Sequence, residues 1–142
     1  MGILRLVIVA VSFVAFGAKA EAKAPEGTDS ARLHKMASGE VLKKYYFVML
    51  TKGARRDEIK DTASINNLQR GHMANMARLH KMGKLVVAGP FDEDINWRGI
   101  FIFDCNTEEE VKTLLATDPA IAAGRLTYEV HAWWTQQGTV FK

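Results

Sequence analysis

The residue with the clearest capacity for chemistry in this sequence is a histidine on the apolar side of a predicted helix. At about 100° per residue, five side chains fall within about 60° of one line: Leu68, His72, Met76, Leu79 and Met82. An inward-facing imidazole needs one partner for its N–H and another for its lone pair. Because imidazoles titrate near neutral pH, such a ring suits a general acid or base. His72 is therefore the first candidate catalytic residue, and a core histidine bonded to a backbone carbonyl is the alternative.

The sequence indicates no second reactive centre. His80 lies two helical turns beyond His72, roughly 12 Å along the axis, so the two rings cannot share a metal ion. No spacing of His, Asp and Glu is typical of a zinc or iron site, and we expect neither a metal nor a cofactor. The single cysteine, Cys105, lies in phase with Phe101 and Phe103 of a predicted strand, which favours a small core residue over a nucleophile.

Three further residues are candidates for contact with a ligand. Gly89 and Pro90 follow a predicted strand beside the helix, where they would shape the mouth of a pocket. A plain strand-ending turn is the alternative for this pair. Trp97 would contribute, with Phe91 and Tyr46, an aromatic wall for a planar compound.

The elements that must position His72 follow one another in the order β-α-β-β-α-β. Residue patterns predict strands over 45–50, 84–88, 97–104 and 126–134, and helices over 64–82 and 107–116. Gly83 is placed to end the longer helix. Two right-handed crossovers on a four-stranded antiparallel sheet give an α+β fold, the ferredoxin-like βαββαβ plait, with its helices on one face.

The strand over 126–134 indicates how the other face of that sheet is covered. Alternate side chains there form a mixed set that includes a tryptophan: Thr127, Glu129, His131 and Trp133. A second subunit on this face would remove the tryptophan and its apolar neighbours from water, so we predict a homodimer. In such a dimer His131 either lines the interior between the sheets or has a structural or solvated role.

The first 20 residues are expected to be a signal peptide. Arg5 precedes an apolar run over 6–18, and Ala18-Lys19-Ala20 has the small-x-small form that signal peptidases cleave. The run is shorter than the roughly 20 residues that span a bilayer. We therefore expect export, to the periplasm or as a secreted protein, without stable membrane insertion after cleavage, and an uncleaved anchor is the alternative.

The rest of the chain reads as one domain preceded by a tail. Residues 21–44 are polar and small, which is typical of a flexible segment or a loosely docked helix, and the folded domain is expected over 45–142. Loss of Arg5 and Lys19 with the signal lowers the net charge from +3 to +1. Since no basic cluster exceeds two residues, we expect no nucleic acid partner.

Four short blocks of the sequence resemble the YCII-related domain family over about 45–134. They are 69–76 (QRGHMANM), 79–85 (LHKMGKL), 88–90 (AGP) and 116–124 (ATDPAIAAG). The resemblance implies a dimeric α+β barrel, in which two plaits close their sheets around a shared interior. It also implies an active site built on a histidine and an aspartate, which map here to His72 and Asp118. The family is similar to enzymes that dehydrochlorinate aromatic ring compounds.

Asp118 has two roles open to it on physical grounds. A carboxylate that accepts one imidazole proton fixes the tautomer and leaves the other ring nitrogen to take or give a proton. Asp-Pro is equally typical of a helix N-cap with proline at the first helical position. One carboxylate can serve both roles.

These patterns favour an exported small-molecule enzyme. In it His72, oriented by Asp118, would transfer a proton on a small cyclic or aromatic compound, in a lyase or isomerase type of step. The alternatives are a non-catalytic dimeric module that binds a small ligand in the same pocket, and a structural dimer whose pair is satisfied internally. Members of the family are usually cytosolic, so export would change the substrate, and the charged loop 53–61 either selects that substrate or is simply solvated.

Overall fold

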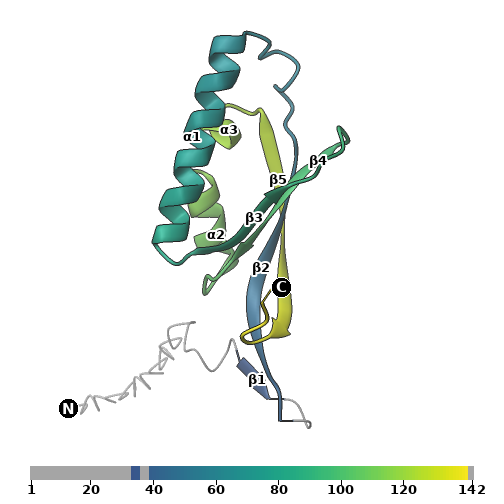
Figure 1. Cartoon of the computed structure of the whole chain (residues 1–142), viewed down its shortest axis with the longest axis vertical. Coiled ribbons are helices and arrows are strands. Elements are labelled where there is room, and N and C mark those ends of the chain that lie inside the picture. Colours follow the sequence, from purple (N-terminus) through teal and green to yellow (C-terminus); the bar gives the residue numbers. More distant parts are fainter. Residues whose placement is uncertain (1–32, 36–38, 141–142) are drawn as a thin grey trace, which may run out of the picture.

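The computed structural model of this chain describes residues 33–35 and 39–140. The predicted signal peptide (1–20) lies outside these ranges, as do residues 21–32 and 36–38 of the segment after it. In the described part of the chain an antiparallel sheet carries three helices on one face, and its other face has no helix on it (Figure 1). None of these helices combines the length and the apolar character that crossing a membrane requires.

The sheet is built around its longest strand, β2 (Val41–Lys52). β2 pairs with β4 (Trp97–Phe103) and with β5 (Leu126–Gln136). β3 (Leu85–Pro90) pairs with β4 at the edge, and the short β1 (Leu33–Lys35) pairs with the start of β2. All pairings are antiparallel and the four long strands have the order β3-β4-β2-β5. Two interleaved βαβ units give this order, so the predicted ferredoxin-like α+β plait is confirmed.

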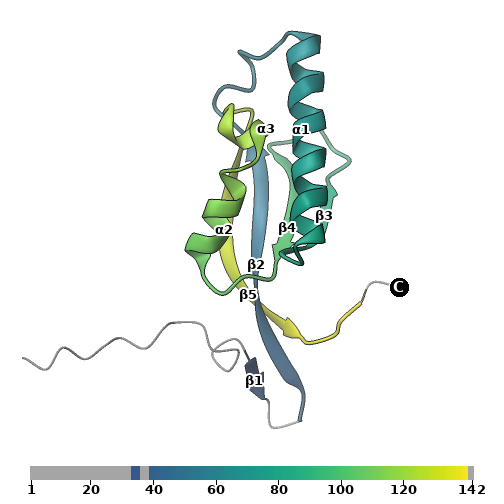
Figure 2. The same ribbon diagram turned by 90° about the vertical axis from the view of Figure 1, so that its left-hand side faces the viewer.

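Local sequence signals set the ends of the helices. α1 (Thr62–Lys81) begins at Asp61, whose carboxylate accepts a hydrogen bond of 2.7 Å from an amide of the first turn. It ends just before Gly83, whose φ of +71° favours glycine. α2 (Glu108–Leu115) and α3 (Pro119–Ala122) also follow capping side chains. Figure 2 shows α1 running beside α2 and α3 over the same face of the sheet.

The core lies between the helices and the sheet. β5 adds partly buried side chains to it. Its buried members come from β2, β3, β4, α1 and α2 and from the segment after β4: Tyr46, Val48, Leu50, Leu79, Leu85, Phe101, Phe103, Cys105, Val111 and Leu115. Cys105 is fully buried, so its predicted place in the core is confirmed.

Three strands are longer than the sequence predicts: β2, β3 and β5, which continues to Gln136. β3 does not end before Gly89 and Pro90 but includes both. It is an edge strand that ends at Pro90, so the missing N–H costs no hydrogen bond to a further strand. β2 begins at Val41, because residues 42–44 pair with the end of β5. Residues 41–44 therefore belong to the sheet and not to a flexible segment.

Candidate active site

His72 and Asp118 meet in a buried hydrogen bond although 46 positions separate them in the sequence. His72 Nδ1 lies 2.6 Å from Asp118 Oδ2, and the two side chains are 11% and 1% exposed. An ionised carboxylate only accepts hydrogen bonds, so Nδ1 carries the proton and donates it. In the neutral ring the lone pair is then on Nε2, which is the nitrogen able to take a proton.

Asp118 has both of the roles that its sequence context permits. Its Oδ1 accepts hydrogen bonds from the amides of Ala120 (2.9 Å) and Ile121 (3.4 Å), which caps α3, while Oδ2 holds His72. Burial raises the pKa of this carboxyl, but the hydrogen bond and charge of His72 and the two amides outweigh burial. The pKa of Asp118 therefore lies below its usual value. The carboxylate stays ionised at neutral pH.

Gly71 lets α1 and α3 approach closely enough for this contact. A Cβ at Gly71 would come within 2.8 Å of Pro119 Cγ, closer than side chains pack. Pro119 directly follows Asp118, so the spacing of the two helices at this point also sets the distance between Asp118 and His72. The glycine has a packing reason to stand in a helix interior, where it would otherwise be unfavourable.

We expect Gly71→Ala to lower the free energy of unfolding by about 1 kcal/mol, since overpacking costs more than the gain in helix propensity returns. Urea denaturation measures the change, and the NMR shift of the His72 Nδ1 proton reports whether the contact with Asp118 lengthens. If Gly71→Ala is instead more stable than the wild type, the close approach of α1 and α3 does not constrain this position.

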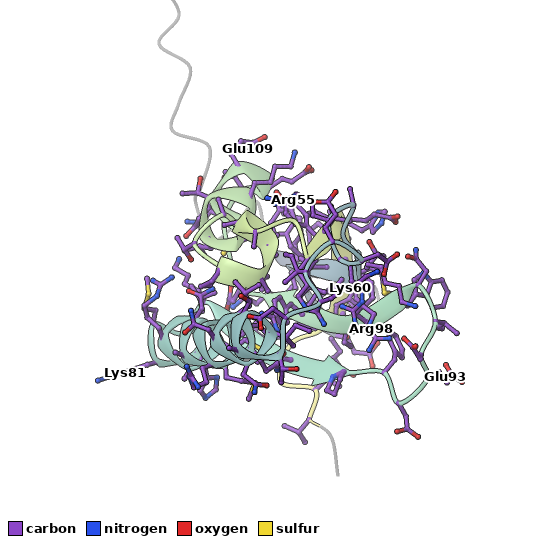
Figure 3. The ribbon with its side chains drawn as sticks, turned by 90° about the horizontal axis from the view of Figure 1, so that it is seen from above. Arg55, Lys60, Lys81, Glu93, Arg98 and Glu109 are labelled. Carbon is purple, nitrogen blue, oxygen red and sulfur yellow. The ribbon has the colours of Figure 1, made fainter. Side chains whose placement is uncertain are left out.

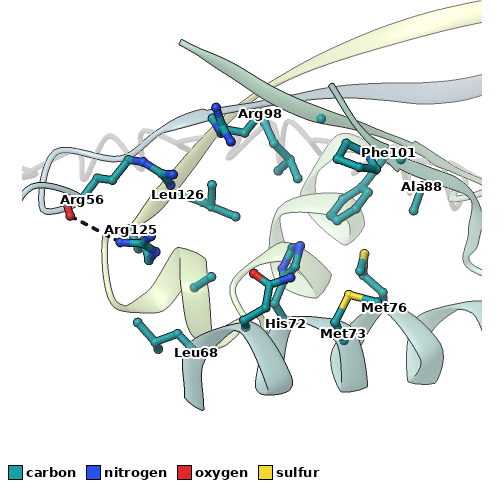
Figure 4. Close-up of a pocket in the computed structure, with 16 residues that line it drawn as sticks. Arg56, Leu68, His72, Met73, Met76, Ala88, Arg98, Phe101, Arg125 and Leu126 are labelled. Atoms are coloured by element: carbon teal, nitrogen blue, oxygen red, sulfur yellow. Dashed lines mark hydrogen bonds between the residues drawn. The ribbon is translucent and has the colours of Figure 1, made fainter. Parts of the chain in front are cut away.

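A pocket of about 430 Å³ lies beside the imidazole, between α1 and the sheet. The ring of His72 points from α1 into this pocket (Figure 4). It stacks on Phe101 of β4, with ring centroids 5.9 Å apart and an interplanar angle of 24°, which fixes its orientation. Leu68, Met76 and Leu126 contribute apolar wall. A volume of this size accommodates a small cyclic compound.

Comparison with known proteins identifies the family. The profile of the YCII-related domain matches residues 45–134, which is more than half of the chain. The chain belongs to the YCII-related domain family. Among solved structures, the 5-chloro-2-hydroxyhydroquinone dehydrochlorinase of Burkholderia phenoliruptrix AC1100, in complex with 2,5-dihydroxybenzoquinone, is 21% identical. That match covers 62% of this chain and 92% of the other, with a TM-score of 0.41. Among curated proteins none matches this chain.

Gly89 and Pro90 line the pocket of this YCII-related domain, and they do so from β3 rather than from a turn. Pro90 lies opposite Gly99 of β4. A Cβ at Gly99 would come within 2.5 Å of the Gly89 carbonyl oxygen, so the two strands approach this closely only with glycine there. The edge strand thus forms one wall of the pocket with its backbone.

The structure does not bring Trp97 to the pocket, which corrects its predicted place in an aromatic wall. Its side chain is 51% exposed and packs against Phe91, with ring centroids 6.1 Å apart. Trp97 stands four residues from Phe101 along β4, about 13 Å away at the rise of a strand. Phe101 is the aromatic residue that lines the pocket.

A polar network behind the pair was missed at the level of sequence. Asn75 is buried, and its Oδ1 accepts a hydrogen bond from Arg78 Nη2 (2.7 Å) and lies 3.1 Å from the Thr117 hydroxyl. Its Nδ2 lies 3.5 Å from Asp118 Oδ2. Asn75 follows His72 by three residues, so the two side chains lie on the same face of α1 and the helical spacing could have identified Asn75. A search of that face for apolar residues alone does not find an amide.

Three arginines of the pocket were also missed. Arg56, Arg98 and Arg125 line it from the loop after β2, from β4 and from the turn before β5. Figure 3 labels Arg98 on the side of the molecule that also carries Lys60 of this loop. Such distant segments give no local motif, and the charge of the 53–61 loop was the one available hint.

His80 and His131 lie outside this pocket. His80 Nδ1 is 3.0 Å from the carbonyl oxygen of Leu85, and His131 is exposed on β5 with its Nε2 3.6 Å from Glu129 Oε2. Within residues 33–35 and 39–140, no three His, Cys, Asp or Glu side chains gather as a metal ion would require.

Proposed function

We propose that this YCII-related protein is an enzyme that moves a proton on a small cyclic or aromatic compound, in a lyase or isomerase type of reaction. The observation that carries the proposal is the 2.6 Å contact between His72 Nδ1 and Asp118 Oδ2 at the edge of the pocket. The family resemblance supports it, because the histidine and aspartate that it implies map onto these two residues.

In the proposed reaction His72 Nε2 takes a proton from a C–H or O–H group of the bound compound, and the bonding electrons stay on the compound. Asp118 keeps the proton on Nδ1 and stabilises the imidazolium that forms. In an isomerase step, His72 returns the proton at another atom. In a lyase step, a leaving group departs with an electron pair from the neighbouring atom, and the proton passes to water.

Proton exchange with solvent tests the proposal even while the natural substrate is unidentified. Small hydroxylated aromatic and cyclic carbonyl compounds would be incubated with the protein in D₂O and followed by NMR. Deuterium uptake or a new product above the protein-free rate, for at least one compound, is expected. Binding of compounds without exchange or product in any of them would favour the alternative, a non-catalytic module that binds a small ligand.

We also propose that the protein acts as a homodimer. Cross-strand partners point to the same face of a sheet, and the pairings put six apolar residues on the face away from the helices, which we call the open face: Phe47, Met49, Val87, Ile100, Ile102 and Trp133. Trp133 is 42% exposed in the single chain. Glu129 and His131 share this face, and the apolar side chains beside them support association with a second copy.

Light scattering after size exclusion should give twice the mass of one chain. Phe47→Lys is expected to yield a monomer, because it buries a charge at the centre of the open face. Ala74→Lys, on the solvent side of α1, adds the same charge and should leave the dimer intact. A wild-type protein that elutes as a monomer at high concentration would contradict the dimer.

A further inference from the structure

Three guanidinium groups converge on the pocket that His72 enters. Figure 4 shows Arg56, Arg98 and Arg125 reaching toward one shared space, across the pocket from α1. They come from three separate segments, so their convergence is a product of the fold. None of the described residues that line the pocket is an Asp or a Glu. This end of the pocket is therefore strongly positive.

Two of these arginines donate side-chain hydrogen bonds to other residues of the protein. Arg125 Nη1 donates to the carbonyl oxygens of Arg56 (3.4 Å) and Ile59 (3.2 Å), which ties the loop to the start of β5. Arg98 Nη1 donates to Asp94 Oδ1 at 2.8 Å. One guanidinium has five N–H donors, so both side chains retain donors for a ligand.

The side chain of Arg56 differs, because no hydrogen bond or ion pair joins it to another residue in the part of the chain that the structure describes. Burial, then the charges of Arg125 and Arg98, lower the pKa of Arg56, and the opposing effects of Asp94 and Asp57 are smaller. Arginine remains charged regardless. A partly buried cation that faces two like charges lacks an anionic partner, and the open space before it is the pocket.

We propose that the substrate of this enzyme is a small cyclic carboxylate, held at its carboxylate by Arg56 and Arg98 while its ring lies against Phe101 and His72. This inference rests on the proposed function, since it names the class of compound on which His72 acts. A planar guanidinium can donate two parallel hydrogen bonds to one carboxylate. We therefore expect Arg56 to bind the carboxylate through two hydrogen bonds and not through one. Anchoring one end of the compound in this way places its reacting atom beside Nε2.

Benzoate and benzyl alcohol provide the test, because they share a ring and differ in charge. We expect calorimetry or NMR titration to give tighter binding of benzoate by the wild-type protein. Arg56→Gln should weaken benzoate binding by roughly 10- to 100-fold and leave binding of benzyl alcohol unchanged. Arg55→Gln is the matched control: it removes the same charge from the adjacent residue, whose exposed side chain pairs with Glu58.

The outcomes separate this inference from the proposed function. His72→Gln removes a contact to the ring that the acid and the alcohol share, so it should keep the preference for benzoate over benzyl alcohol, and the anion site stands even if no turnover is found. Equal binding of the acid and the alcohol, no binding of benzoate or cyclohexanecarboxylate, or equal losses in the Arg55 and Arg56 variants would each overturn the anion site. Loss of the preference for benzoate over benzyl alcohol in His72→Gln would also overturn it, because the carboxylate would then lie on the histidine.

Discussion

Replacement of His72 by Gln is expected to reduce turnover roughly 10²- to 10⁴-fold, the range typical of a lost general acid or base. The amide group of Gln can donate to Asp118 as Nδ1 does and has no basic nitrogen. The buried carboxylate thus keeps a hydrogen-bond partner, and the free energy of unfolding should change little. Initial rates on a compound that the wild type converts, with urea denaturation alongside, measure both quantities.

His80→Gln is the matched control for this variant. His80 lies on the same helix, outside the pocket, and its ring contacts only a backbone carbonyl among the hydrogen bonds described. The same substitution there should leave turnover unchanged. If His72→Gln retains the wild-type rate while remaining folded, His72 takes no part in proton transfer and the pair is structural.

The fold could be predicted because its signals are local. Alternating and helical periodicities and the glycine at position 83 each act within a few residues, and the order of the elements then leaves few topologies. His72 could be predicted for the same reason. A polar side chain in an apolar stripe conflicts with its surroundings, and such a conflict identifies a site that the rest of the fold must satisfy.

The sequence could not provide the contacts that only tertiary structure creates. The three arginines of the pocket lie on distant segments, so no spacing relates them until the 53–61 loop folds back over the start of β5. Trp97 was wrongly predicted to line the pocket, because the sequence shows that a strand carries an aromatic residue but not how far along the strand the pocket lies. The end of β3 was misplaced because Pro90 breaks most strands and is tolerated at an edge.

Asp118→Asn is expected to lower turnover as severely as loss of His72, by roughly 10⁴-fold if it acts as the wrong tautomer does in a Ser-His-Asp triad. Asn caps helices about as well as Asp, so its carbonyl oxygen should keep the amides of Ala120 and Ile121. Its NH₂ group then faces His72 Nδ1, which must accept instead of donate. The ring proton moves to Nε2, the lone pair that takes the proton is gone, and ¹⁵N NMR of the imidazole should report the exchanged tautomer.

Asp118→Asn should also differ from the wild type in how its free energy of unfolding changes with pH. The pKa of Asp118 is lower in the folded protein than its usual value, so the unfolded chain binds a proton first as the pH falls. The contribution of this carboxylate is therefore complete above an unfolded-state pKa of about 3.9 and is lost as the pH falls through the folded-state value. Urea denaturation should show a deficit for Asp118→Asn at neutral pH that shrinks in acid, whereas Asp61 and Asp94, whose pKa values are also lowered, titrate alike in both proteins. A deficit that is constant at all pH values would mean that the charge of Asp118 does not stabilise the folded protein, and that its hydrogen bond with His72 gains nothing from that charge.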